Sequence, residues 1–266
     1  ESMGCTVKEI ADRMAGWADP AWAESYDNCG LLIGHGEQQV DSVVTALDVT
    51  EETVDYAIRM GAQMIVAHHP IIFRPVKLIV DDTRDGARLL KIIEHRLAVY
   101  AAHTNMDAAL GGTNDIAAER LGLLYVRPLS PVGGDTGAGM GRVGNLPKAM
   151  SVREFALYAK DAFDAESVRM VSRDPERTVY RVALCTGKGM SFFEEAIRQH
   201  ADVYLTGDVS YHEAEAALAG DVSIVDAGHF STELPIAEAM AQYLQQEEEG
   251  LQVYPFTAQT NPFQTL

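Results

Sequence analysis

Two stretches of the chain, residues 43–70 and 182–209, share one order of elements, and this internal repeat constrains the fold most. Aligned without a gap at an offset of 139 residues, they place the tripeptide Ala-Ile-Arg at 57–59 over the same tripeptide at 196–198. Each stretch predicts a strand, a helix and a second strand. Strands that alternate with helices of this length are typical of α/β proteins with parallel strands, so we expect duplicated α/β units.

Further strands and helices alternate around the repeat. Capping boxes, in which Ser or Thr is followed three residues later by Glu, predict helix starts at Thr6, Ser151 and Ser191. The expected strands cover residues 42–47, 63–67, 97–102, 180–185, 202–206 and 223–226. The other expected helices cover residues 51–60, 85–95 and 114–121, and a last helix runs to about residue 246.

The composition shifts towards glycine between residues 128 and 147, where six glycines occur from Gly133 to Gly144. We interpret this segment as the passage into a second domain. The expected first domain, which carries the candidate ligands discussed below, combines residues 3–127 and 223–266, and the second covers residues 128–222.

The segment GMGRVG, residues 139–144, has the GxGxxG spacing of dinucleotide-binding loops. However, no apolar strand precedes it, and Asn145-Leu146-Pro147 follows where a helix should begin. We therefore interpret it as a loop without a cofactor role.

Composition and charge exclude several classes of protein. The chain has 266 residues, of which 47% are hydrophobic, and this is enough for a sizeable globular core. A net charge of −18 opposes attraction to nucleic acid or anionic lipid. No apolar run approaches the roughly 18 residues of a membrane helix, and the N-terminus has no signal-peptide pattern. Three widely spaced cysteines, Cys5, Cys29 and Cys185, build no disulfide framework, so we expect a cytoplasmic protein.

The apolar run 64–67 ends on His68, His69 and Pro70. Because side chains alternate along a strand and Pro70 stops the ladder, we expect the two imidazoles to point in different directions. Each could bind one of two neighbouring ions, or one could be a ligand and the other a structural donor. The alternative is a pair of hydrogen-bonded loop histidines. Gly207 and Asp208 stand at the same positions of the second copy, which therefore does not share their role.

Two more expected strands are followed by a histidine with a carboxylate four residues later: His103 with Asp107, and His229 with Glu233. Open α/β sheets bind ligands at the carboxyl ends of their strands, and a spacing of four brings two side chains to one face of a helix. Taken singly, each motif could be a capping carboxylate beside a packed histidine. The recurrence at three strand ends favours a functional site.

Imidazole and carboxylate ligands without a nearby thiolate indicate Zn, Mn, Fe or Co. Two such ions, held about 3.5–4 Å apart by a bridging carboxylate, would lower the pKa of a bound water and supply hydroxide at neutral pH. This chemistry predicts metal-assisted hydrolysis.

Two other polar segments follow expected strands. In CTGKG, residues 185–189, backbone N–H groups and Lys188 could hold a phosphate, but an ordinary βα turn explains the segment better. TGDVSYHEA carries Asp208, Tyr211 and His212, which could be an acid, a base or substrate donors, or a capping Asp and surface groups.

Taken together, six motifs resemble the Nif-three-like family, also called the GTP cyclohydrolase 1 type 2 homologues. They are YDNCGLLIG, AHHPIIF, HTNMD, GMGRVGNLP, TGDVSYHEA and GHFSTE, in the family's order. The resemblance implies an α/β fold of two intertwined α/β domains with duplicated strand-helix-strand units and mixed sheets. It also implies a dinuclear metal centre in the interdomain cleft and assembly into a homohexamer.

Carried over residue by residue, the resemblance implies two divalent metal ions per chain. His68 and His229 would bind one ion, His69 and Asp107 the other, and Glu233 would bridge them, with His103 close by. Cys29 and Tyr26 depart from the family's usual residues, which are an aliphatic side chain and a Trp. Neither belongs to the implied ligand set.

The first hypothesis is a metal-dependent hydrolase that acts on a small nucleotide-like or phosphate-bearing substrate, with His103 or His212 as the catalytic group that moves protons. The family label implies ring-opening of GTP, but a dinuclear centre suits phosphoester hydrolysis as well. The alternative is a non-catalytic metal-binding or scaffold protein. A metal coordination position open to water would distinguish catalysis from structure.

Overall fold

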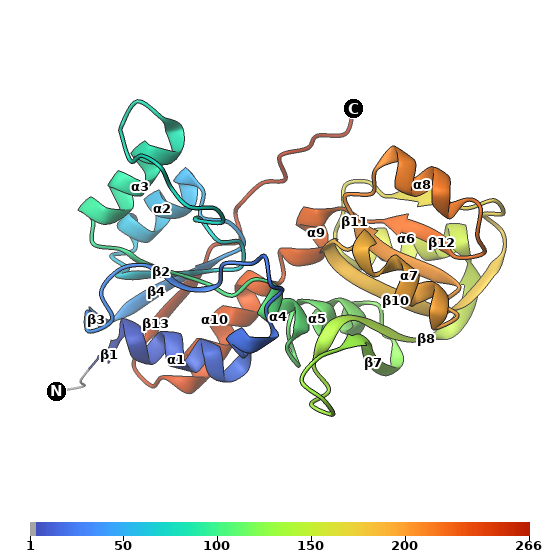
Figure 1. Ribbon diagram of the computed structural model, residues 1–266, viewed down its shortest axis with the longest axis horizontal. Helices are drawn as coiled ribbons and strands as arrows, with labels where there is room; N and C mark the ends of the chain where they lie inside the picture. Colours follow the sequence, from blue (N-terminus) through green and yellow to red (C-terminus); the bar gives the residue numbers. More distant parts are fainter. Residues whose placement is uncertain (1–3) are drawn as a thin grey trace. The chain divides into compact units, whose positions relative to one another are not determined.

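The computed structural model describes residues 4–266, which form two compact α/β units (Figure 1). Unit 1 contains the chain up to Met106 and returns for Ile236–Thr260, whereas unit 2 contains Asp107–Pro235 and Asn261–Leu266. Each unit is therefore built from two separate stretches of sequence, as the expected intertwined arrangement requires.

Unit 1 contains a five-stranded sheet in the order β13-β4-β5-β6-β2. The first four strands are parallel, and β2 pairs antiparallel with β6 at the edge. Every residue of β4, β5 and β6 is buried, as is typical of parallel strands that are covered on both faces. The strands are β2 (Gly30–Ile33), β4 (Ser42–Ala46), β5 (Met64–Ala67), β6 (Ala98–Ala101) and β13 (Gln252–Pro255).

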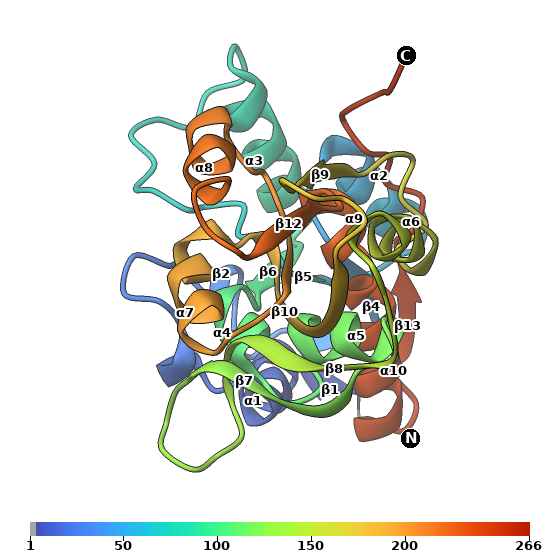
Figure 2. The same cartoon turned by 90° about the vertical axis from the view of Figure 1, so that its right-hand side faces the viewer.

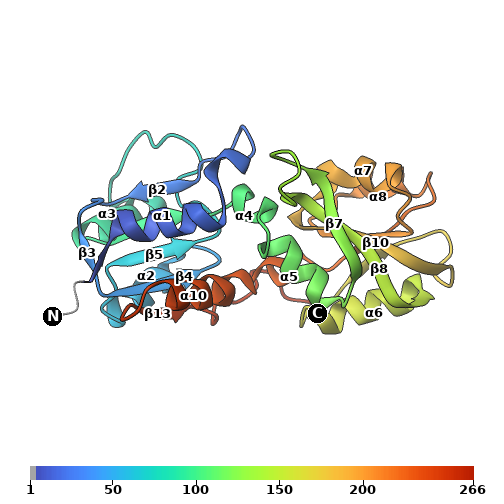
Figure 3. The same ribbon diagram turned by 90° about the horizontal axis from the view of Figure 1, so that it is seen from below.

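Helices cover both faces of this sheet (Figures 1 and 3). On one face lie α1 (Val7–Trp17) and α10 (Ile236–Glu247), and on the other lie α2 (Glu51–Arg59) and α3 (Arg84–Glu94). The predicted capping box at Thr6 is confirmed, because its side chain accepts from the Glu9 N–H while Glu9 accepts in return. Three short elements complete the unit: β1 (Cys5–Thr6), which pairs with β3 (Gln39–Val40), and the 3-10 turn η1 (Pro20–Trp22).

Unit 2 contains a six-stranded mixed sheet in the order β7-β8-β10-β11-β12-β9. The strands β10, β11 and β12 are parallel, whereas β7, β8 and β9 pair antiparallel with their neighbours. The strands are β7 (Leu124–Pro131), β8 (Gly139–Ser151), β9 (Arg169–Val171), β10 (Thr178–Lys188), β11 (Val203–Gly207) and β12 (Ser223–Asp226).

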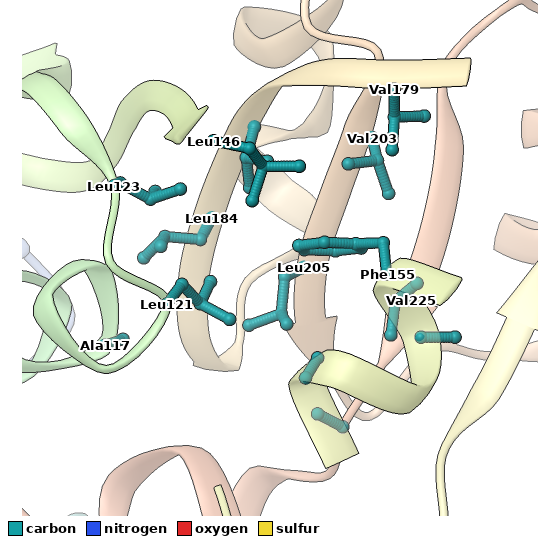
Figure 4. Close-up of a cluster of buried hydrophobic side chains, with 14 of the residues drawn as sticks. Ala117, Leu121, Leu123, Leu146, Phe155, Val179, Leu184, Val203, Leu205 and Val225 are labelled. Carbon is teal, nitrogen blue, oxygen red and sulfur yellow. The ribbon is translucent and has the colours of Figure 1, made fainter. Parts of the chain in front are cut away.

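Helices α5 (Thr113–Arg120) and α6 (Val152–Ala162) pack on one face of this sheet. Helices α7 (Phe193–Arg198) and α8 (Tyr211–Ala217) lie on the other (Figures 2 and 3). Figure 4 shows Leu121 and Phe155 against Leu184 and Leu205 in the core between α5, α6 and the sheet. Shorter elements of unit 2 are η2 (Met190–Phe192) and α9 (His229–Glu233), while α4 (Thr104–Ala108) contains the point where the sequence passes from unit 1 to unit 2.

The repeat is confirmed, because β4-α2-β5 and β10-α7-β11 are both strand-helix-strand units with parallel strands. The capping box expected at Ser191 is wrong. Ser191 lies inside η2, and α7 begins at Phe193 without a side-chain cap.

The interpretation of residues 139–144 as a loop is also wrong, because they lie in β8 and pair with β7 and β10. The glycines permit close strand packing. A Cβ on Gly139 would lie 2.4 Å from the Ser130 carbonyl oxygen. Gly141 has φ +67° and would bring a Cβ to 2.6 Å from the Leu184 carbonyl oxygen.

The two units also differ from the expected domains. Residues 107–127, 223–235 and 261–266, expected in the first domain, belong to unit 2. In this unit β12 pairs with β11, and α5 packs on the six-stranded sheet. Residue 3, the expected start of the first domain, lies outside the described residues. None of the helices in residues 4–266 combines the length and apolar character needed to cross a membrane.

Candidate metal centre

His68 and His69 follow the end of β5 in unit 1. Their backbone N–H groups donate to the carbonyls of Ala46 and Leu47 at 3.1 and 2.9 Å, which continues the contact with the first strand of the repeat. The centroids of the two rings lie 5.0 Å apart, and the angle between the ring planes is 43°. The rings therefore lie side by side, although their Nδ1 atoms face different neighbours, the Ala102 carbonyl for His68 and Asp48 for His69.

His103 joins this pair from the end of the neighbouring strand β6. Its ring centroid lies 5.3 Å from that of His68 and 5.6 Å from that of His69. One nitrogen of each ring lies within 4.8 Å of the others, so the three could hold a metal ion. We call His68, His69 and His103 the imidazole cluster.

Each ring of the imidazole cluster turns Nδ1 towards an oxygen that can only accept a hydrogen bond. An Nδ1–H donor is therefore required, and this tautomer puts the lone pair on Nε2. Metal-binding histidines in proteins are oriented in the same way. The three pairs, each at 2.7 Å, are His68 with the Ala102 carbonyl, His69 with Asp48 Oδ1, and His103 with Asp27 Oδ1.

Asp27 is held firmly beside His103. Its other carboxylate oxygen accepts from the backbone N–H of Thr104 at 3.0 Å and from the Thr104 hydroxyl. Burial raises the pKa of Asp27, but the hydrogen bonds from His103 and Thr104 outweigh it and hold this pKa well below its usual value. Asp27 is therefore an ionised partner of His103 at neutral pH.

Asp48 is held by the last residues of unit 1. Gln259 donates from Nε2 to Asp48 Oδ2 at 2.6 Å, and the Asp48 N–H donates to Gln259 Oε1 at 3.2 Å. Gln259 thus holds both the backbone and the side chain of Asp48, whose carboxylate orients His69. No sequence pattern marks Asp27, Asp48 or Gln259 as part of the site, although Asp27 lies in the motif YDNCGLLIG.

In unit 2, His229 and Glu233 lie one turn apart on α9, as their spacing predicts. His229 Nε2 is 2.9 Å from Glu233 Oε2, and its Nδ1 is 2.7 Å from Asp208 Oδ2. Burial lowers the pKa of His229, but Glu233 and Asp208 outweigh it and raise this pKa to about 9. Asp208 therefore plays the same part for His229 as Asp48 does for His69.

Gly187, at the end of β10, gives Glu233 and His229 the space they occupy. A Cβ at this position would lie 2.2 Å from Glu233 Oε1 and 3.1 Å from His229 Nε2, and φ is +68°. The Gly187 N–H donates to the Thr232 hydroxyl at 3.0 Å. The glycine of CTGKG thus allows α9 to approach the strand closely.

Asp107 is buried in the same unit. The hydroxyl of Thr113 donates to Asp107 Oδ1 at 2.5 Å, and Asn114 donates to its backbone carbonyl at 2.9 Å. Burial raises the pKa of the Cys185 thiol, and the charges of Asp107 and Glu233 raise it further, so both carboxylates lie near this sulfur. We call Asp107, His229 and Glu233 the carboxylate cluster.

His212 lies apart from these side chains in unit 2. It is on α8 with its side chain 89% exposed, and its Nδ1 is 3.6 Å from Glu215 Oε2. Within residues 4–266, no group of potential metal ligands includes His212. Tyr211 is also exposed and contacts the His212 ring.

The sequence is similar to a known protein family and to named relatives. The family model Duf34/NIF3 (NGG1p interacting factor 3) matches residues 5–262. A protein from Clostridium acetobutylicum named "GTP cyclohydrolase 1 type 2 homolog" is 35% identical over 244 residues, which cover 91% of each chain. A protein of the same name from Streptococcus pneumoniae is 37% identical and covers 89% of this chain and 91% of its own length.

The fold is also similar to that of solved structures. A Bacillus cereus protein described as related to NIF3 aligns over 100% of both chains, with a TM-score of 0.94 and 27% identity. A hypothetical protein from Staphylococcus aureus aligns over 99% of this chain with a TM-score of 0.92. The match extends over both units.

Proposed function

The chain belongs to the Duf34/NIF3 family, and we propose that it is a hydrolase that uses two divalent metal ions. The proposed ligands are His68, His69, Asp107, His229 and Glu233, as the family resemblance implies. The proposed substrate is small and nucleotide-like or phosphate-bearing.

The observation that carries this proposal is the orientation of four imidazoles by oxygen acceptors. His68, His69, His103 and His229 each place Nδ1 at 2.7 Å from a carbonyl or carboxylate oxygen. Packed histidines in an ordinary core have no need of this common arrangement. The three proposed ligands among them, His68, His69 and His229, do need it, because the acceptor fixes the ring and raises the basicity of the nitrogen that would bind the ion.

Several of the proposed ligands lie near the points where the chain passes from one unit to the other. The chain leaves unit 1 after Met106, between His103 and Asp107, and returns at Ile236, three residues after Glu233. Candidate ligands thus lie close in the sequence to two of the points where the chain changes from one unit to the other. We propose that Glu233 bridges the ions.

The donor set suits Zn, Mn, Fe or Co, because it combines imidazole nitrogens with carboxylate oxygens. When bound, two such ions supply an activated water and neutralise charge on an oxyanion. Glu233 and Asp107 have exposed fractions of 3% and 6%, so both would offer their oxygens to the ions away from bulk water.

His103 is the proposed group for proton transfer. Its Nδ1 is bound to ionised Asp27, which would stabilise a proton taken up at Nε2. His212, the other candidate from the sequence, has an exposed side chain that pairs with Glu215, which offers less support for a catalytic role.

The substrate class rests on the family and on the proposed ions. Two relatives carry the name "GTP cyclohydrolase 1 type 2 homolog", which makes GTP one substrate to test beside phosphomonoesters and phosphodiesters. The proposal also includes the expected homohexamer in the cytoplasm, and light scattering of the purified protein tests the oligomer.

Metal analysis and turnover on this substrate panel test the proposal, with wild type beside Glu233→Gln. Wild type purified without chelators should bind about two ions per chain. Glu233→Gln should lose ions and turnover, whereas Glu238→Gln, which changes an exposed acid on α10, should keep both. Fewer than two ions in wild type would disprove the dinuclear centre. Full loading without turnover would instead favour a non-catalytic metal-binding or scaffold protein.

A further inference from the structure

Unit 2 contains a basic pocket of about 690 Å³ that none of the proposed metal ligands lines. Arg127 of β7, Arg181 of β10 and Arg198 at the end of α7 contribute guanidinium groups, and Pro128 and Pro131 contribute apolar walls. Three arginines around one pocket contrast with the net charge of −18 of the whole chain. This local excess of positive charge calls for an anionic occupant.

Two of the three guanidinium groups bind only neutral partners. Arg127 Nη2 donates to the side-chain oxygen of Gln199 at 3.1 Å, and Arg181 Nε donates to the backbone carbonyl of Gln199 at 2.7 Å. In the described part of the chain, no carboxylate forms a salt bridge with Arg127 or Arg181. Arg198 pairs with Glu195. The pocket therefore keeps two guanidinium groups that form no salt bridge with a described carboxylate, with N–H donors left for a ligand.

Gln199 holds the pocket in shape. Besides accepting from Arg127 and Arg181, its side-chain amide donates to the Leu129 carbonyl at 2.8 Å and to Glu195 Oε1 at 3.1 Å. The residue after α7 is thus tied both to β7 and to its own helix. Such preorganisation lowers the entropic cost of binding a ligand.

We propose that this pocket binds the diphosphate or triphosphate group of a small molecule. Guanidinium groups match phosphate oxygens with paired N–H donors, and the two that form no salt bridge with a described carboxylate suit a group that carries at least two negative charges. The volume lies in the range of small-molecule sites, and the two prolines can pack against the organic part of the ligand. The overall negative charge opposes long polyanions such as nucleic acid.

The pocket lies far from the carboxylate cluster within unit 2. Arg181 stands near the start of β10, whereas Gly187, beside Glu233, stands six residues further along, roughly 20 Å away at the usual rise of a strand. A ligand in the pocket therefore does not use the proposed metal ligands. The inference does not depend on the hydrolase proposal.

Calorimetric titration of the full chain with pyrophosphate, in the presence of a chelator, tests this site. We expect one saturable site per chain that persists when ions are removed, and no binding of guanosine, which lacks phosphate. Arg127→Gln and Arg181→Gln should each weaken binding about tenfold, because each removes a charged hydrogen-bond donor. The control is Arg153→Gln, which changes an exposed arginine of α6 that pairs with Glu176. It should change the affinity for pyrophosphate less than about twofold.

Three results would overturn the proposal: loss of pyrophosphate binding on chelation, equal weakening by Arg153→Gln, or wild-type binding by both pocket variants. Tighter binding of a single-stranded oligonucleotide than of pyrophosphate would reassign the surface to nucleic acid and also overturn it. Arg127 is exposed, so its variant decides the question if Arg181→Gln fails to fold.

Discussion

Asp48 Oδ1 lies 2.7 Å from His69 Nδ1, and Gln259 holds the second oxygen of the same carboxylate at 2.6 Å. If His69 binds a metal ion, loss of this support should weaken binding. We expect Asp48→Ala to lower metal affinity about 10- to 100-fold, and Gln259→Leu to lower it less, because Asp48 still contacts the ring. Competition titration with a chromophoric chelator measures both.

The matched control is Asp55→Ala, which removes a carboxylate of α2 that binds Lys91 at the surface. Its metal affinity should equal that of wild type. Equal affinity in Asp48→Ala and wild type would show that His69 needs no orientation by Asp48, and would argue against His69 as a ligand.

Gly187→Ala should damage the carboxylate cluster by steric exclusion. A Cβ at 2.2 Å from Glu233 Oε1 forces Glu233 to move, and the positive φ adds backbone strain. We expect a loss of stability of about 1–3 kcal/mol and loss of metal from the Glu233 position, measured by urea denaturation and metal analysis. Gly220→Ala is the control, because its nearest neighbour would lie 3.7 Å away. Full metal content in Gly187→Ala would contradict the assignment of Glu233.

His229 makes the stability of the metal-free protein depend on pH. The pKa of His229 in the folded chain is about 9, above the ordinary 6.5, so the folded state binds this proton more tightly. The resulting stabilisation is complete below pH 6.5 and is lost as the pH rises through about 9. Thermal unfolding of chelator-treated protein between pH 6 and 10 should show this decline, reduced in Asp208→Asn, which removes one of the two carboxylate partners. An identical decline in Asp208→Asn would refute the assignment.

Asp27 has the opposite dependence on pH. Its folded-state pKa lies below the ordinary value of 3.8, so it contributes stability above that pH which is lost as the pH falls further. Asp27→Asn should therefore be less stable than wild type at neutral pH, with the difference shrinking in acid. If His103 moves protons, the same variant should lose about 100-fold in turnover and shift the pH–rate profile. Unchanged turnover in Asp27→Asn would argue against His103.

The repeat made the two parallel strand-helix-strand units predictable, because short apolar runs and amphipathic helices alternate there without interruption. The candidate ligands were predictable because strand ends carry them. Their orienting partners were not: Asp48 and Asp27 lie 21 and 76 residues from their histidines, and no local pattern links a carboxylate to a ring at such a distance. Position 48 corresponds to Gly187 in the second copy, and position 69 to Asp208, so the two copies differ at the candidate ligand His69 and at its partner Asp48.

The β7–β8 pair was not predicted, because glycines normally disfavour strands and these ones serve close packing between strands. The burial of Arg142, which lies in the same segment, was not predicted from the sequence either. Its side chain is 1% exposed, and its guanidinium donates to Asp115 Oδ1 at 2.5 Å and to the carbonyl of Gly139 at 2.6 Å. A charged side chain in the core of unit 2 is tolerated because neighbouring oxygens satisfy its donors.

Arg142→Met should therefore destabilise the protein by about 3 kcal/mol, because it leaves Asp115 and several buried carbonyls without their donor. Arg142→Lys should recover only part of this loss, since a single ammonium cannot reach both Asp115 and the carbonyls. Urea denaturation measures both variants, with Arg153→Met as the exposed control, expected to change stability by less than about 0.5 kcal/mol. If Arg142→Met is as stable as wild type, the guanidinium contributes no net stability, and an apolar side chain of similar volume is sufficient at this position.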